Sequence, residues 1–125
     1  MREAIVAVFK DKFNCDIYQN MTPEKVPYPV GAFAIADEIV NKEIDGYGFT
    51  SREVIFDVSI VCKDLNQVDL IRYMLLELSG KTGHRWSNLF SVMFVRSVED
   101  VGPYLGVDND ENPPHIIDFR LSFFE

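Results

Sequence analysis

The chain has 125 residues, of which 47% are hydrophobic, and it contains ten Phe. A chain of this length is a single domain, here residues 1–125, and it can bury about two thirds of its unfolded surface. This composition excludes a disordered or low-complexity segment. The formal net charge is −8 and the twelve basic residues are scattered, which argues against a nucleic-acid binder, because such proteins cluster Lys and Arg against phosphates.

Targeting and redox signals are absent from the sequence. No apolar run approaches the ~20 residues that a membrane-spanning helix needs, and the first residues lack the cleavage region of a signal peptide. We therefore expect a protein that is cytosolic where it is made and has no membrane partner. Cys15 and Cys62 are too few and too far apart for a zinc site or a disulfide framework, so we expect reduced thiols that are buried or half-buried.

The N-terminal third predicts one helix and two extended segments. Arg2–Phe13 carries an apolar stripe at helical spacing and is expected to end at Asn14; the stripe is Ile5, Val6, Phe9 and Phe13. Ile17–Gln19 reads as a short extended segment. Pro27-Tyr28-Pro29 forbids helix around it, and Ala32–Val40 after it is a predicted strand.

The segment Glu43–Ser51 contains Asp45-Gly46-Tyr47-Gly48, whose glycines permit a tight or mobile loop. Two interpretations remain open. In the first, the segment is a hairpin turn whose aromatic side chains, Tyr47 and Phe49, fold back on the sheet. In the second, it is a projecting arm that presents both aromatics to a partner protein, because exposed aromatics are typical interface anchors.

The clearest secondary-structure signals follow one another between residues 52 and 80. Arg52–Lys63 alternates with period two and predicts a half-buried strand whose apolar row is Val54, Phe56, Val58, Ile60 and Cys62. Asp64 is a predicted helix cap with Gln67 completing a capping box, and Gly80 is the predicted terminator. The apolar positions of this helix are Val68, Ile71, Leu75 and Leu78.

Two further strands are expected near the C-terminus. After a polar loop, Lys81–Asn88, which contains His84 and Trp86, Leu89–Val98 predicts a strand. His115–Phe124 predicts another, with Asp118 and Arg120 on its second face, where they can meet charges on a neighbouring strand. We expect much of the core from Phe90, Phe94, Phe119 and Phe123.

Between these strands, Glu99–Asn112 is acidic and contains no basic residue. Its carboxylates are Glu99, Asp100, Asp108, Asp110 and Glu111. The twelve-residue spacing of a calcium loop, with its central Gly and terminal Glu, is missing. A solvated acidic loop is the expected structure, and a weak cation site is the alternative.

The element order predicts an α+β fold: a two-layer sandwich with an antiparallel or mixed sheet of four to five strands and two helices packed on one face. A sheet with so few strands leaves open edges, which favour pairing with another subunit. No Gly-rich phosphate loop, nucleophile elbow or metal motif is present, so we expect no catalytic residue, cofactor or metal. An enzyme would need His84 or His115 beside a carboxylate whose proximity a sequence cannot show.

This order of elements resembles the tail-terminator, or tail-completion, proteins of long-tailed bacteriophages. The likeness spans nearly the whole chain. It rests on Ile17-Tyr18, on Pro27-Tyr28-Pro29-Val30 before a strand, on a strand running directly into a helix, and on a final strand pair with Arg96 before the acidic connection. The length of Glu99–Asn112 and the presence of Trp86 depart from the group's pattern and suggest contact surfaces specific to one phage.

The resemblance implies a homo-oligomeric ring, usually a hexamer, that stops the growth of the tail tube and joins the tail to the head connector. Its partners would be the tail tube protein and the connector protein, and the family has no known cofactor or catalytic residue. DNA must pass through such a ring without sticking, so an acidic lumen is expected, and we assign it to the five carboxylates of Glu99–Asn112. Tyr47, Phe49 and Trp86 are the candidate protein contacts. The alternatives are another neck protein and a small ligand-binding regulatory domain.

Overall fold

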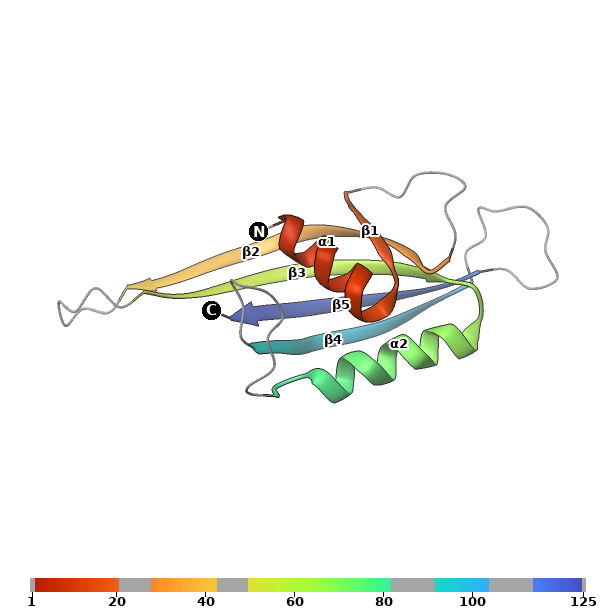
Figure 1. Ribbon diagram of the computed structural model, residues 1–125. Coiled ribbons are helices and arrows are strands. Elements are labelled where there is room, and N and C mark those ends of the chain that lie inside the picture. The colour runs from red at the N-terminus through yellow and green to blue at the C-terminus, as the bar shows by residue number, and fades with distance from the viewer. Residues whose placement is uncertain (1, 21–27, 43–49, 82–91, 104–113, 125) are drawn as a thin grey trace.

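The computed structural model describes residues 2–20, 28–42, 50–81, 92–103 and 114–124 (Figure 1). These residues form one five-stranded sheet in the order β1-β2-β3-β5-β4 and two helices, an α+β fold as the sequence predicts. The elements are α1 (Arg2–Phe13), β1 (Asp16–Gln19), β2 (Val30–Lys42), β3 (Thr50–Cys62), α2 (Leu65–Leu78), β4 (Val92–Pro103) and β5 (His115–Phe124). The sheet is mixed, because β1 pairs with β2 in parallel and the other pairs are antiparallel.

Both helices cover the same face of the sheet and share one core with it (Figure 1). The predicted alternation of β3 is confirmed, since Val54, Phe56, Val58, Ile60 and Cys62 are all buried. β5 contributes the matching row of Ile117, Phe119, Leu121 and Phe123. The ring of Phe56 meets the rings of Phe33 and Phe123 edge to face, at centroid distances of 6.1 and 5.5 Å.

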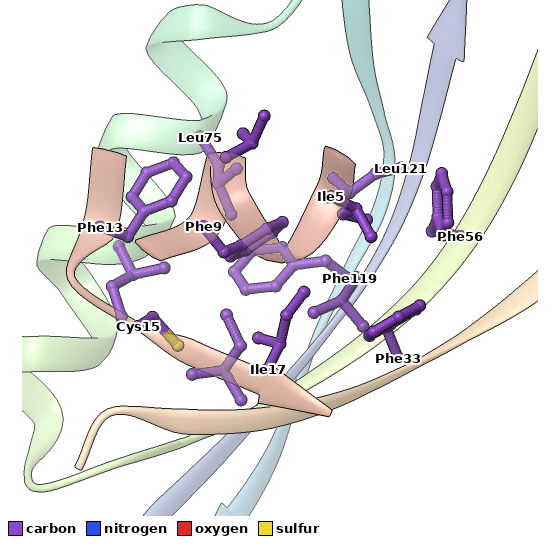
Figure 2. Packing of buried hydrophobic residues seen from close by; sticks show 14 of the residues in the cluster. Ile5, Phe9, Phe13, Cys15, Ile17, Phe33, Phe56, Leu75, Phe119 and Leu121 are labelled. Atoms are coloured by element: carbon purple, nitrogen blue, oxygen red, sulfur yellow. The ribbon is translucent and has the colours of Figure 1, made fainter. Parts of the chain in front are cut away.

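α1 lies across the middle of this core. Figure 2 shows Ile5, Phe9 and Phe13 pointing from α1 towards the sheet, with Leu75 of α2 beside them. The helix ends where predicted, because Asn14 adopts a positive φ of 50° and its N–H donates to the carbonyl of Lys10. The chain then turns directly into β1, where Ile17 is buried under α1.

α2 begins and ends at the predicted residues. The carboxylate of Asp64 accepts a hydrogen bond from the Gln67 N–H at 2.9 Å, and the Gln67 side chain accepts one from the Lys63 N–H at 2.7 Å. Two N–H groups at the helix entrance are thereby satisfied. At the other end Gly80 has a φ of 75°, and its N–H donates to the Met93 carbonyl at 2.7 Å, which ties the end of α2 to β4.

The prediction for β4 ends the strand too early and assigns its side chains to the wrong faces of the sheet. The strand ends at Pro103 rather than Val98, and residues 89–91 lie outside the described residues. Met93 is the buried residue and pairs with Phe123, so Phe94 points to the opposite face and is 42% exposed. The expectation that Phe94 builds the core is therefore wrong, while Phe119 and Phe123 are confirmed; Phe90 lies outside the described residues.

Candidate functional site

The face of the sheet opposite the helices carries a set of polar side chains brought together by strand register. One cross-strand row runs Ala32, Ser59, Asp118 and Glu99, and the next runs Ala34, Asp57, Arg120 and Ser97. These two rows line a hollow of about 470 Å³, to which Asn20 after β1 also contributes. We call this surface, defined by the eight residues of the two rows, the polar sheet face.

An ion pair occupies the centre of the polar sheet face. The guanidinium of Arg120 donates to both carboxylate oxygens of Asp57, at 2.8 and 3.0 Å. This hydrogen bonding raises the pKa of Arg120 above its usual value. The sequence-based expectation that Arg120 meets a charge on a neighbouring strand is confirmed, because Asp57 lies directly opposite it on β3.

Among the described residues, Asp118 has no such partner. It sits between Ser59 and Glu99 in the adjacent row, and its Oδ1 is buried without a hydrogen-bond partner among the described residues. The two rows therefore hold three carboxylates, of Asp57, Asp118 and Glu99, against the single guanidinium of Arg120. A surface of this composition repels anions.

A second ion pair lies further along the same sheet. Arg96 is the extra residue of a β-bulge between Val95 and Ser97, and it donates to the Ser122 hydroxyl at 2.8 Å and to the Glu53 carboxylate at 2.8 Å. The bulge thus joins β4 to both β5 and β3 through one side chain. Bulges commonly redirect a side chain in this way.

The structure corrects the expected position of Glu99 and Asp100. Both belong to β4 rather than to a loop, and they do not act together. Glu99 lies opposite Asp118 in the strand register, on the polar sheet face. The Asp100 carboxylate instead hydrogen-bonds to the His115 ring and accepts from the Gly102 N–H. The continuation of the strand beyond Val98 was not predicted, because a second bulge, between Asp100 and Gly102, breaks the period-two pattern.

The remaining predicted site residues lie outside the described residues. They are the contact candidates Tyr47, Phe49 and Trp86 and the acidic residues Asp108, Asp110 and Glu111. His84 lies outside them as well. Their roles stay predictions.

The hydrogen bond between His115 and Asp100 places a histidine beside a carboxylate, which is the condition for an enzyme that a sequence cannot test. Cys62 lies opposite His115 on β3, so the residue types of a thiol triad are close together. Burial, followed by the charge of Asp64, raises the pKa of the Cys62 thiol to about 12. A thiol with this pKa is neutral at physiological pH, whereas a nucleophilic cysteine needs a lowered pKa. Cys62 thus packs as a core residue.

The described residues contain no group of three or more His, Cys, Asp or Glu placed to hold a metal ion. None of the described helices is long and apolar enough to cross a membrane.

One edge of the sheet is covered, and the other is largely open. β1 pairs only with the first four residues of β2, Val30–Phe33, so among the described residues 34–42 of β2 have a neighbouring strand on one side alone. At the other edge β4 carries two bulges, and the end of α2 binds it: Gly80 donates to the Met93 carbonyl and Ser79 accepts from the Val95 N–H. Bulges and a covered edge disfavour strand pairing between subunits at β4, whereas the open part of β2 permits it.

Sequence reasoning missed the outer surface of α2. Four large apolar side chains on this helix are exposed: Leu65, Leu70, Tyr73 and Leu76. The signal was available, because nine of the 14 residues in LNQVDLIRYMLLEL are apolar, more than one buried face of a helix accommodates.

Comparison with known proteins adds no family assignment. No family model and no curated protein matches this chain.

Proposed function

We propose that this chain is a structural subunit of a bacteriophage tail, a tail terminator that forms a ring on the last layer of the tail tube and joins the tail to the head connector. The observation that carries the proposal is the polar sheet face: an acidic surface that neither helix covers, because both helices pack on the opposite side of the sheet. A subunit that lines a passage for DNA needs such a surface, because carboxylates repel the phosphates and keep the duplex moving.

The order of elements supports the proposal. The resemblance to tail terminators implies a helix, a short strand, a Pro-Tyr-Pro entry into a long strand, and a central strand leading into a second helix. The described residues have this order, with Tyr28-Pro29 immediately before β2 and β3 joined to α2 by two residues.

The proposed lumen surface differs from the one that the sequence suggests. The carboxylates in the two rows of the polar sheet face are Asp57, Asp118 and Glu99, drawn from three neighbouring strands. We therefore assign the lumen to the polar sheet face. The described part of the chain holds Asp100 against His115, so Asp100 is not assigned to it.

Assembly on tubes provides the direct test. The full chain is added to tail tube protein from the same genome during polymerisation, and tube lengths and tube ends are imaged by negative-stain electron microscopy. We expect shorter tubes that carry a ring at one end. Tubes of unchanged length with bare ends would overturn the proposal.

The lumen assignment has its own test. Asp118→Lys combined with Glu99→Lys turns two of the three carboxylates into cations, and we expect rings that still cap tubes but retain DNA during ejection. The matched control is Glu3→Lys with Asp11→Lys, which makes the same charge change on the exposed side of α1. Equal DNA retention in both double variants would remove the lumen role from the polar sheet face.

A small ligand-binding regulatory domain is the second candidate, favoured by the hollow itself. A volume of about 470 Å³ falls within the range of ligand pockets, and the carboxylates of Asp118 and Glu99 would select a cationic metabolite. A rise in melting temperature with small polyamines, lost in Asp118→Asn, would support this function. An unchanged melting temperature would exclude it for that ligand class.

A further inference from the structure

α2 exposes more apolar surface than its place in the fold requires. Its side chains Leu65, Leu70, Tyr73 and Leu76 are 57, 58, 66 and 46% exposed, although the same helix buries Val68, Ile71 and Leu75 against the sheet. Single exposed apolar residues are normal, but four on a 14-residue helix form a patch of the kind that marks a protein contact. α2 lies along the margin of the molecule next to β4, whereas α1 lies over the middle of the sheet (Figure 1).

Four residues on this exposed side follow the spacing of a helix-pairing seam. Leu65, Asp69, Arg72 and Leu76 are separated by four, three and four residues, and all four are exposed. Steps of four and three residues keep side chains in one line when two helices pack together. The seam therefore has a Leu at each end and two opposite charges in the middle.

We propose that α2 pairs with α2 of a second copy of this chain, antiparallel and around a two-fold axis. In this register Leu65 of each copy meets Leu76 of the other, and Asp69 of each copy meets Arg72 of the other. The seam is self-complementary, as an isologous contact requires. Parallel pairing would instead place Asp69 against Asp69 and Arg72 against Arg72.

The charges at the centre of the seam are available for this contact. The described residues provide no ion pair to Asp69 or Arg72, whereas other charges on the surface do have partners, such as Glu77 with Lys81 and Asp57 with Arg120. At the ends of the seam Asp64 approaches Glu77 of the second copy. Lys81, 3.8 Å from Glu77, offsets that repulsion.

The size of the seam sets the expected strength. A 14-residue helix is about 21 Å long, so a contact made by two such helices falls below the ~1,200 Å² of a stable interface. We expect a weak dimer that forms as concentration rises. The contact leaves the polar sheet face free and is isologous, whereas a closed ring is built from head-to-tail contacts, so the pairing does not depend on the proposed function.

Charge reversal tests the pairing in the full chain. Either Asp69→Arg or Arg72→Asp alone puts two pairs of like charges into the contact. We expect the dissociation constant of the dimer, measured by sedimentation equilibrium, to rise about tenfold or more. An equimolar mixture of the two variants restores both ion pairs, and so does the double variant in one chain. A wild type that stays monomeric, an oligomer insensitive to either single change, or a mixture that fails to associate would each overturn the proposal.

Cross-linking tests the register. Leu65→Cys mixed with Leu76→Cys should be joined by a short bis-maleimide, whereas Leu65→Cys alone should not, because its two copies lie about 17 Å apart along the helix axis. Cys15 and Cys62 are buried and neutral, which keeps the background low. Cross-linking of Leu65→Cys to itself with none in the mixture would overturn the antiparallel arrangement.

Discussion

Asp57 and Arg120 face each other from neighbouring strands and share two hydrogen bonds, of 2.8 and 3.0 Å, at the centre of the polar sheet face. Both side chains are about half exposed, at 48 and 52%. Because water screens such a pair, its contribution to stability is small even though its geometry is favourable. The pair fixes the position of the guanidinium rather than holding the sheet together.

We predict that Asp57→Asn lowers the melting temperature by a few degrees at most, and that the loss shrinks in about 1 M salt, where exposed charges are screened within a few ångströms. Thermal unfolding followed by circular dichroism at low and high salt measures both effects. Arg120→Gln should behave in the same way. The double variant should lose no more melting temperature than either single variant does. A large loss that is independent of salt would show that the pair is structural.

Gly31 is a position where any side chain collides with the neighbouring strand. A Cβ at this residue would stand 2.6 Å from the Ser59 carbonyl oxygen and 3.3 Å from side-chain atoms of Ile17 and Ile60. Since the closest atom belongs to the backbone of β3, it cannot rotate away. We predict that Gly31→Ala lowers the free energy of unfolding by about 1–3 kcal/mol.

The matched control for Gly31 is Ala32→Ser, which changes the next residue on the uncovered side of β2 and should stay within about 0.5 kcal/mol of wild type. Urea unfolding of the three proteins compares them directly. Equal midpoints for Gly31→Ala and wild type would mean that β2 and β3 can separate without loss of stability.

Phe56 and Phe94 have opposite environments although the sequence places both in apolar alternating strands. Phe56 is fully buried between Phe33 and Phe123, whereas Phe94 is 42% exposed and contacts Phe124 edge to face at 5.6 Å. We predict a loss of about 3–5 kcal/mol for Phe56→Ala, because it leaves a cavity in the core. Phe94→Ala should cost less than about 2 kcal/mol. Chemical denaturation measures the loss in free energy of unfolding for both variants. A larger loss for Phe94→Ala than for Phe56→Ala would contradict the placement of Phe94 on the exposed face of β4.

Sequence reasoning succeeded where one local rule dominates. The alternation of β3, the cap at Asp64 and the terminator at Gly80 each depend on neighbours within a few residues, and each is confirmed. β4 failed for two physical reasons. All four residues of Val92–Val95 are apolar, so alternation does not decide which face is buried, and the two bulges that follow depend on the partner strand, which a sequence does not reveal.

The candidate site was harder to predict than the fold. Asp57, Asp118 and Glu99 are up to 61 residues apart in the chain and meet only through register. The sequence identified Asp118 and Arg120 as residues of a second face, but it could not supply Asp57 as the partner. The contiguous acidic run Glu99–Asn112 attracted attention instead, because proximity along the chain is the only proximity that a sequence displays.

The entrance of α2 depends on one side chain. Asp64 accepts from the Gln67 N–H, and without it one of the first N–H groups of the helix loses its partner. We predict that Asp64→Ala lowers the free energy of unfolding by about 1 kcal/mol, whereas Asp64→Ser, whose hydroxyl can cap the same N–H, loses much less. Urea unfolding separates the two. Equal losses would mean that the carboxylate acts through its charge alone.

The two buried thiols make the free energy of unfolding depend on pH in the alkaline range. Burial is the main cause that raises the pKa of both Cys15 and Cys62 from 9.0 to about 12, so the folded protein holds these protons more tightly than the unfolded chain does. The corresponding stability is fully present below pH 9 and is lost as the pH rises towards 12. Each thiol can contribute a slope of up to about 1.4 kcal/mol per pH unit within that window.

We therefore predict that the free energy of unfolding of wild type falls more steeply between pH 9 and pH 11 than that of the Cys15→Ala, Cys62→Ala double variant. Lys and Tyr residues titrate in both proteins, so the difference between the two slopes isolates the thiols. At pH 7 the variant should be the less stable protein, because two buried side chains have been shortened. The measurement is urea unfolding across the pH series. Parallel slopes would mean that the thiols ionise as easily in the folded protein as in the unfolded chain, which their complete burial beneath α1 and beside α2 argues against.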